Sequence, residues 1–151
     1  MPDVHDKQTR SRNMAAIKGK NTKPELILRS LLHQAGFRFR LNSTLPGKPD
    51  LILPKYRAAV FMHGCFWHSH GCPRFKQPTE NSDFWRRKLE RNIRRDKEVS
   101  YLLKEAGWRQ LIIWECTIIG KGRMEPEKLI NLIKEWLISE SQYGEISGQF
   151  K

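Results

Sequence analysis

The sequence predicts an α/β domain in which a mixed sheet lies between helices. Its 151 residues suit a single domain. Apolar side chains recur at helical spacing in three segments, and short apolar or alternating runs between them indicate four strands. The order is helix, three strands, helix, strand, helix. The fourth strand therefore pairs most easily in parallel with an earlier one, through a right-handed crossover.

The first half of the chain predicts one helix and a meander of three strands. The residues Thr22-Lys23-Pro24-Glu25 form a capping box with proline in the first helical turn, and Gly36 ends the apolar stripe that follows. Residues 37–41 alternate between apolar and basic side chains, which is typical of a strand. Two further apolar runs, 50–54 and 56–62, predict the second and third strands.

The second half predicts a long helix, a strand and a last helix. The long helix covers residues 84–106, begins after Ser82 or Asp83 and ends at Gly107. Its apolar stripe predicts a packed face, and its other faces are rich in arginine and lysine. The stripe consists of Trp85, Leu89, Ile93, Val99, Leu102 and Leu103. A strand at 108–114 and a helix at 126–139 complete the set.

The chain divides by composition into three parts. Residues 1–20 form a basic N-terminal arm, 21–139 the folded domain, and 140–151 a polar tail that we expect to be frayed. The N-terminus lacks the apolar core of a signal peptide, and no run of eighteen apolar residues could span a membrane. These features predict a cytoplasmic protein.

The net charge predicts a polyanionic partner. Lysine and arginine number 28 against 16 acidic residues, which gives +12 at pH 7. Such a field favours nucleic acid, because neutralised phosphates release condensed counterions. The alternatives are a role in solubility or an anionic membrane surface. The membrane is disfavoured because no basic amphipathic helix with an aromatic face is evident.

The three cysteines predict a metal site. An odd count without a secretion signal argues against a disulfide framework. The spacing Cys65-x4-His70-x-Cys72 brings three ligands together, and Cys116 follows the strand at 108–114. Three thiolates and one imidazole make a closed tetrahedral site of the structural zinc type. The alternative is three buried, reduced cysteines.

The metal-ligand stretch HGCFWHSHGC, residues 63–72, also contains candidates for chemistry. His68 lies between two ligands, so its backbone would be held firmly, and an imidazole suits a general base. The alternative is a surface histidine without a task. Phe66 and Trp67 are either core residues or, if they point outward, wedges that enter a base stack. Asp50, at the start of an apolar strand, could bind magnesium beside a phosphate, although a turn aspartate is the common explanation.

Several motifs together resemble the very-short-patch mismatch-repair endonucleases, called Vsr. The resemblance is carried by PGKPD at 46–50, FMHGCFWH at 61–68, Cys72 and WEC at 114–116, and it extends from the N-terminal segment through the last helix. It implies a type II restriction-endonuclease-like fold with a mixed central sheet. It also implies an Mg²⁺-dependent enzyme that nicks one strand of double-stranded DNA 5′ to the thymine of a T·G mismatch. Such an enzyme would act as a monomer, and repair proteins would follow it.

The resemblance also implies roles for individual residues. Asp50 and the main-chain carbonyl of Met62 would bind Mg²⁺, and His68 would be the general base. Support for the hydrated metal and the phosphate would come from His63, Glu25 and Asp96. Structural zinc would be bound by Cys65, His70, Cys72 and Cys116, and intercalation would come from Met14, Phe66 and Trp67.

Two of these residues have rival explanations. Glu25 is also the capping-box residue, and it could serve both purposes. Asp96 falls on the apolar stripe of the long helix, where an inward carboxylate needs a partner. A site histidine or a water would serve, and so would a neighbouring arginine at the edge of the stripe.

Two functions of other classes remain open from the residues alone. One is a non-catalytic, zinc-stabilised DNA-binding module, which would bind DNA tightly without cleaving it. The other is a zinc hydrolase or deaminase, which would need an open coordination position on the metal.

Overall fold

The computed structural model describes residues 22–41 and 43–150, which form a four-stranded mixed sheet with helices on both faces. The strands lie in the order β1 (Leu51–Leu53), β2 (Ala58–His63), β3 (Arg109–Trp114) and β4 (Tyr143–Ile146). β1 runs antiparallel to β2, whereas β2, β3 and β4 are parallel. The predicted parallel pairing across the long helix is therefore confirmed. No helix among the described residues is long and apolar enough to cross a bilayer.

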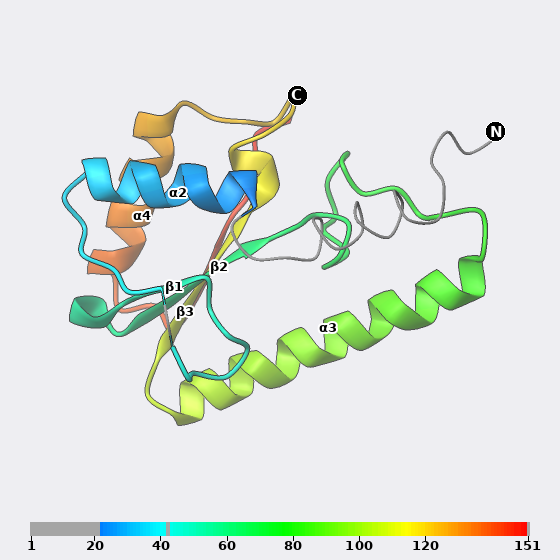
Figure 1. Ribbon diagram of the computed structural model, residues 1–151, viewed down its shortest axis with the longest axis horizontal. Coiled ribbons are helices and arrows are strands. Elements are labelled where there is room, and N and C mark those ends of the chain that lie inside the picture. Colours follow the sequence, from blue (N-terminus) through cyan, green and yellow to red (C-terminus); the bar gives the residue numbers. More distant parts are fainter. Residues whose placement is uncertain (1–21, 42, 151) are drawn as a thin grey trace, which may run out of the picture.

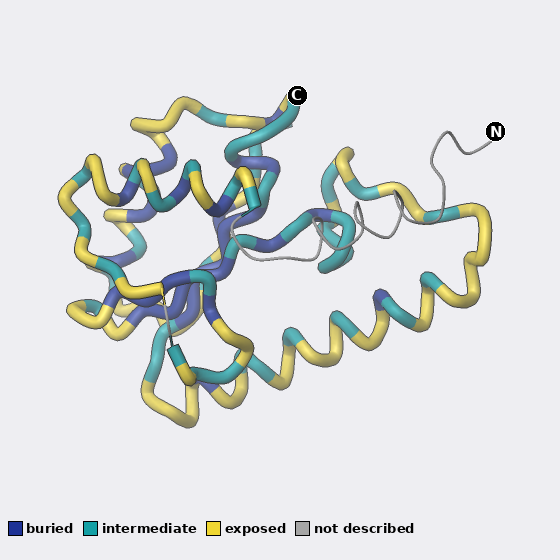
Figure 2. Tube along the Cα trace, viewed as in Figure 1, coloured by how far each residue is buried: buried dark blue, intermediate teal, exposed yellow. Residues whose placement is uncertain are grey.

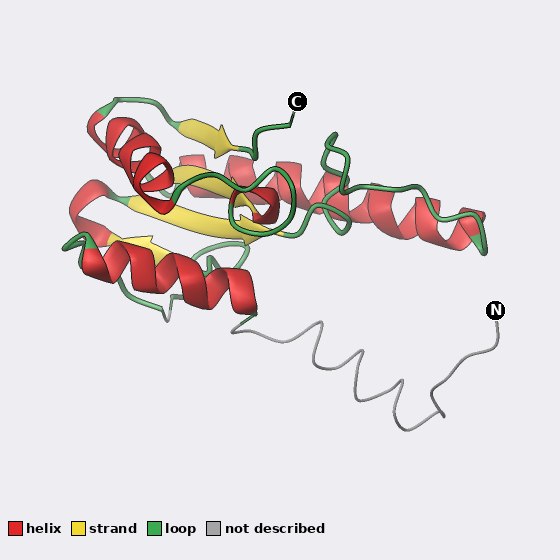
Figure 3. Ribbon diagram, turned by 90° about the horizontal axis from the view of Figure 1, so that it is seen from above, coloured by secondary structure: helices red, strands yellow, loops and turns green. Residues whose placement is uncertain are grey.

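The helices separate into two layers. α2 (Lys23–Gln34) and α4 (Pro126–Ile138) cover one face of the sheet, and α3 (Ser82–Glu105) lies on the other (Figures 1 and 3). Short 3-10 turns follow β1 and β3, at Pro54–Tyr56 and Glu115–Thr117. Two apolar clusters fill the two interfaces between helices and sheet.

Alternation along the strands supplies both clusters at once. In β2, Val60 packs with the α2 and α4 side while Phe61 packs with the α3 side, and Leu111 and Ile112 of β3 divide in the same way. Strands buried on both faces read as continuous apolar runs, which is how β2 and β3 appear in the sequence.

α3 is only partly a core helix. Of its predicted stripe only Leu89 and Leu103 are buried, while Ile93 is 36% and Leu102 41% exposed. The first half of the helix extends beyond the sheet, and its surface is largely exposed (Figures 1 and 2). The helix is longer than the sheet that it covers, and Leu102, next to buried Leu103, lines a cavity instead of the core, so the stripe prediction was wrong for these residues.

The expected strand at 37–41 is reduced to a single bridge. Arg40 exchanges both backbone hydrogen bonds with Ile52, at 3.0 and 2.8 Å. β1 is only three residues long, so its outer edge can pair with little more than one residue. The predicted three-stranded meander is therefore one hairpin plus a bridge.

The expected frayed tail was wrong for residues 143–146. This segment forms β4 on the edge of β3, and Ile146 is buried in the core. The glycine that suggested flexibility is needed for packing, since a Cβ on Gly144 would collide with the indole nitrogen of Trp136.

Arg109 ties the end of α4 to the start of β3. Its guanidinium donates to the carbonyl oxygens of Trp136, Leu137, Ser139 and Ser141 at 2.8 to 3.1 Å, and it stacks over the Trp136 ring at 4.2 Å. The last carbonyls of a helix have no partner within the helix, so this side chain supplies one.

We expect Arg109→Met to lower the free energy of unfolding by roughly 2 kcal/mol, because charge-assisted hydrogen bonds are lost and carbonyls are left without donors. Urea unfolding followed by circular dichroism measures the change. Arg86→Met is the matched control, since Arg86 is exposed and makes one long ion pair with Asp83 at 3.5 Å. A loss no larger than that of the control would show that the arginine does not stabilise this junction.

Candidate active site and metal centre

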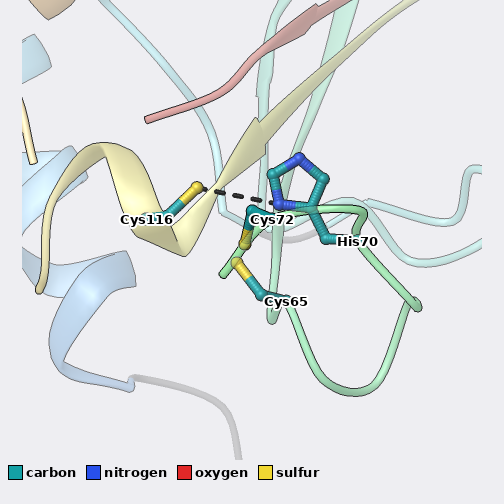
Figure 4. A group of neighbouring side chains, drawn as sticks. All are labelled: Cys65, His70, Cys72 and Cys116. Atoms are coloured by element: carbon teal, nitrogen blue, oxygen red, sulfur yellow. Dashed lines mark hydrogen bonds between the residues drawn. The ribbon is translucent and has the colours of Figure 1, made fainter. Parts of the chain in front are cut away.

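Three side chains of one loop and a fourth from a distant part of the sequence form a candidate metal centre. The ligand atoms of Cys65, His70, Cys72 and Cys116 all lie within 4.8 Å of one another (Figure 4). Three of them come from the loop after β2, and Cys116 comes from the turn after β3. Because β2 and β3 are parallel neighbours, their carboxyl ends deliver both segments to the same place.

The chemistry of this donor set fits a metal ion such as zinc. In a tetrahedral site with Zn–S near 2.3 Å and Zn–N near 2.0 Å, ligand atoms lie roughly 3.5 Å apart. The distance between His70 Nδ1 and Cys116 Sγ is 3.7 Å. Burial and the adjacent Cys116 raise the pKa of the Cys65 thiol. Three thiolates in this place therefore need the positive charge of a bound cation.

Neighbouring side chains hold the centre from two sides. The ring of Trp114 stacks on His70, with centroids 3.9 Å apart and planes within 5°. The Glu115 carboxylate accepts a hydrogen bond from the backbone N–H of Cys65 at 3.1 Å. The same carboxylate oxygen lies 3.6 Å from Arg74 Nε. The loop after β2 is thus attached to the segment after β3 by more than its metal ligands.

A cavity of about 660 Å³ lies beside the metal centre, between the 46–50 turn, the end of β2 and α3. Five of the predicted site residues line it. These are Asp50, Met62, His63, His68 and Asp96. The turn closes tightly on α3, since Gly47 has a φ of +78° and a Cβ there would lie 2.5 Å from Val99.

Asp50 is held next to a second carboxylate. Its Oδ2 accepts a hydrogen bond from the backbone N–H of Met62 at 2.6 Å. Glu25 of α2 lies beside Asp50 and is buried, with 8% of its surface exposed. Burial is the main cause that raises the pKa of Asp50 to about 7. Glu25 adds to the rise, and the Met62 N–H opposes it. No side-chain cap at the start of α2 is formed, and Glu25 points to Asp50 instead.

His68 and His63 form a stacked pair at the other wall of the cavity. Their ring centroids are 3.6 Å apart and their planes within 3°. His68 Nδ1 lies 2.7 Å from Asp96 Oδ2, so with Nδ1 protonated the lone pair is on Nε2. Burial, followed by the proximity of His68, lowers the pKa of His63 to about 3, which keeps this imidazole neutral.

The partner of Asp96 is therefore a histidine rather than an arginine. Asp96 lies on α3, one turn after Asn92, which donates to the main-chain carbonyl of Trp67 at 2.9 Å. Two consecutive loop residues, Trp67 and His68, are thus held by two helix residues four apart. The role of Asn92 was missed, although its i, i+4 spacing to Asp96 was visible in the sequence.

Phe66 and Trp67 lie outside the apolar core of the domain. Both are half-buried and belong to neither core cluster. They form a cluster with Phe75 and with Trp85 of α3, with ring centroids 5.1 to 6.0 Å apart, and Lys88 lies 5.4 Å from the Trp67 ring. The sequence predicts Trp85 only as part of the apolar stripe of the long helix. Met14, the third predicted intercalating residue, lies outside the described residues.

Known proteins match this chain over most of its length. A family profile described as "DNA mismatch endonuclease Vsr" matches residues 2–74. The DNA mismatch endonuclease Vsr of Escherichia coli (strain K12) is 43% identical over 150 residues, covering 99% of this chain and 96% of that protein. The type II nicking enzyme V.XorIIP of Xanthomonas oryzae pv. oryzae is 41% identical over 134 residues, covering 88% and 98%. The type II nicking enzyme V.NmeAIP of Neisseria meningitidis serogroup A is 39% identical over 136 residues, covering 89% and 96%.

Identity of this extent, over nearly the whole of both chains, shows that the protein belongs to the Vsr family of DNA mismatch endonucleases.

Proposed function

We propose that this chain is an Mg²⁺-dependent endonuclease that nicks one strand of duplex DNA 5′ to the thymine of a T·G mismatch, as the first step of very-short-patch repair. The observation that carries the proposal is the cavity that Asp50 and His68 share, in a chain of the Vsr family. As an enzyme of chromosomal DNA it acts in the cytoplasm at the nucleoid. It acts as a monomer, and other repair proteins follow it.

The arrangement around Asp50 supports a type II restriction-endonuclease-like fold. A carboxylate directly before a hairpin strand faces a cavity, and the hairpin is extended by a parallel strand with helices on both faces. Asp50 and the main-chain carbonyl of Met62 would hold the Mg²⁺ ion. When bound, the ion supplies positive charge that polarises the scissile phosphate.

The histidine pair supplies the proton transfer. His68 Nε2 removes a proton from a water molecule, and the resulting hydroxide attacks the phosphorus. The bond from phosphorus to the 3′ oxygen breaks, and that oxygen takes up a proton, so the products carry a 5′-phosphate and a 3′-hydroxyl. Asp96 holds the His68 ring and stabilises its positive charge. His63 would support the phosphate and the hydrated ion from the same wall, and Glu25 would do so from beside Asp50.

Zinc at Cys65, His70, Cys72 and Cys116 has a structural role in this proposal. Four protein ligands leave no open coordination position, so a zinc hydrolase or deaminase is disfavoured. The metal instead fixes the loop that presents His68, Phe66 and Trp67.

A nicking assay on matched and T·G duplexes tests the function. We expect one strand to be cut, on the T·G duplex, with magnesium and not with EDTA. Tight, salt-sensitive binding without magnesium-dependent cleavage would instead establish a non-catalytic DNA-binding module.

His68→Ala should reduce the nicking rate by about 10²- to 10⁴-fold, because the general base is removed. The same variant should retain its zinc, since His68 is outside the ligand set. Single-turnover rates measure the first effect and metal analysis the second. His33→Ala, at an exposed histidine on α2, is the control. Full activity in His68→Ala would refute the mechanism.

Trp67→Ala should weaken the preference for the mismatch more than the affinity for plain duplex, because an aromatic wedge acts where stacking is already poor. Competition binding with T·G and matched duplexes gives both values. Phe84→Ala removes an exposed neighbouring ring, 5.4 Å from Trp85, and serves as the comparison. Equal losses on the two duplexes would count against a wedge.

Asp50→Asn should abolish nicking and yet stabilise the metal-free protein. The folded state raises the pKa of Asp50 from 3.8 to about 7, so it favours the protonated form. The free energy of unfolding of the parent chain therefore falls as the pH rises from about 4 to 7. Asparagine does not ionise, so Asp50→Asn does not show this fall. At about 1.4 kcal/mol per pKa unit, the advantage of Asp50→Asn should reach on the order of 4 kcal/mol at pH 8 and shrink towards pH 4.

Urea unfolding in EDTA at a series of pH values measures this difference. Glu140→Gln, at an exposed carboxylate, should show no such trend. If Asp50→Asn is less stable than the parent chain at pH 8, the Asp50 carboxylate stabilises the fold. It would then not be a group that destabilises the metal-free protein in order to bind a metal.

A further inference from the structure

The segment that follows β4 lies directly against the Cys/His centre. Ser147 Oγ is 3.3 Å from His70 Nε2 and 4.0 Å from Cys116 Sγ. The backbone N–H of Gly148 donates to Cys116 Sγ at 3.2 Å. Two of the four candidate ligands are thus contacted by residues that lie outside the ligand set.

The position of this segment is fixed by close packing. A Cβ on Gly148 would collide with the carbonyl oxygen of Cys116 and lie 2.8 Å from that of Gly122. The next residue, Gln149, donates its N–H to the Gly122 carbonyl at 2.7 Å. The ring of Phe150 covers Gly122 so closely that a Cβ there would lie 2.5 Å from it. Only a glycine at 148 brings its amide to the sulfur.

Pairing of β4 with β3 sets the register of these contacts. Ile146 pairs with Ile113 and is buried in the core, so Ser147 leaves the strand at a defined point. Cys116 follows the end of β3 by two residues. The parallel ladder therefore brings Ser147 and Gly148 to the metal ligand by the same geometry that brings the loop after β2.

The contacts have the chemistry of outer partners of a metal site. His70 turns Nδ1 to Cys116, and Nε2 faces the Ser147 hydroxyl. When Nε2–H donates to that hydroxyl, the lone pair is fixed on Nδ1, where a metal ion needs it. A backbone N–H on a thiolate sulfur stabilises its negative charge, as charge-assisted hydrogen bonds do.

We infer that Ser147 and Gly148 are positioning residues of the metal centre, and that retention of the metal depends on the segment after β4. The inference rests on the proposed zinc site and adds a second set of contributors to it. Loss of outer partners commonly reduces metal affinity 10- to 100-fold. Ser147 is exposed, so its contact alone contributes less than the two together.

Zinc retention in the full-length chain tests this. We expect the double variant Ser147→Ala/Gly148→Ala to release zinc to a chromogenic chelator at least about tenfold faster than the parent chain. Ser147→Thr keeps the hydroxyl, so it should release zinc at close to the rate of the parent chain, and more slowly than Ser147→Ala. Gln149→Ala is the matched control, because this exposed residue uses only its backbone.

A second readout separates a specific contact from a general loosening. In protein loaded with cobalt, the thiolate-to-cobalt absorption band should shift in Gly148→Ala, which moves the amide from Cys116, and should not shift in Gln149→Ala. Near-ultraviolet circular dichroism checks that both variants are folded.

The outcomes distinguish the two proposals. A parent chain that binds no stoichiometric zinc would overturn the proposed metal centre. A parent chain that holds zinc, with variants that release it at the same rate and show the same band, would overturn the role of Ser147 and Gly148 alone.

Discussion

The parallel register of β2 against β3 is the constraint on which both candidate centres depend. His63 of β2 pairs with Trp114 of β3 at the end of this ladder. Two residues further on, β2 leads to Cys65 and β3 leads to Cys116, and both are candidate metal ligands. A shift of one residue would turn every side chain of β2 to the opposite face. It would move His63 out of the cavity and Phe61 out of the core. Burial on both faces makes such a shift costly, so the cores specify the geometry of the site.

α3 provides the second attachment of the loop after β2. Without it, the loop would be held at the metal ligands and at Glu115, and the ring of His68 would keep only its stacking on His63 among these contacts. Asn92 and Asp96 hold Trp67 and His68 by hydrogen bonds of 2.9 and 2.7 Å, and these two helix residues share a face. The loop is therefore fixed at the metal centre on one side and at α3 on the other. This explains why much of α3 lies outside the apolar core.

The sequence predicted best where chemistry or periodicity is local. The ligand types at Cys65, His70 and Cys72 already indicate a metal, and α4 carries a regular apolar stripe on which Leu129, Ile130, Ile133 and Leu137 are buried. β4 was missed because its four residues carry one buried apolar side chain and a glycine, and only the open edge of β3 makes them a strand. The residues alone explained Glu25 locally as part of a capping box, and only the family resemblance assigned it to the same site as Asp50. Roles that depend on two distant elements meeting, such as those of Trp85 and Ser147, have no local signal, and Asn92 has only its i, i+4 spacing to Asp96.

The distribution of charge differs between the surface of the protein and the cavity. The net charge of +12 attracts the duplex to the surface, and most basic residues of α3 are exposed. The residues that line the cavity carry both signs of charge, since Asp50, Asp96 and Glu98 are acidic and Lys48 and Arg95 are basic. Glu25 lies beside Asp50, so a phosphodiester that approached Asp50 would meet like charges at short range. Burial is the main cause of the raised pKa of Asp50, and the neighbouring Glu25 adds to it. In the proposed mechanism, a divalent ion at Asp50 would favour the ionised carboxylate and supply positive charge for the phosphate. The long-range charge would then bring DNA to the protein, and the ion would allow a phosphate to approach the carboxylates.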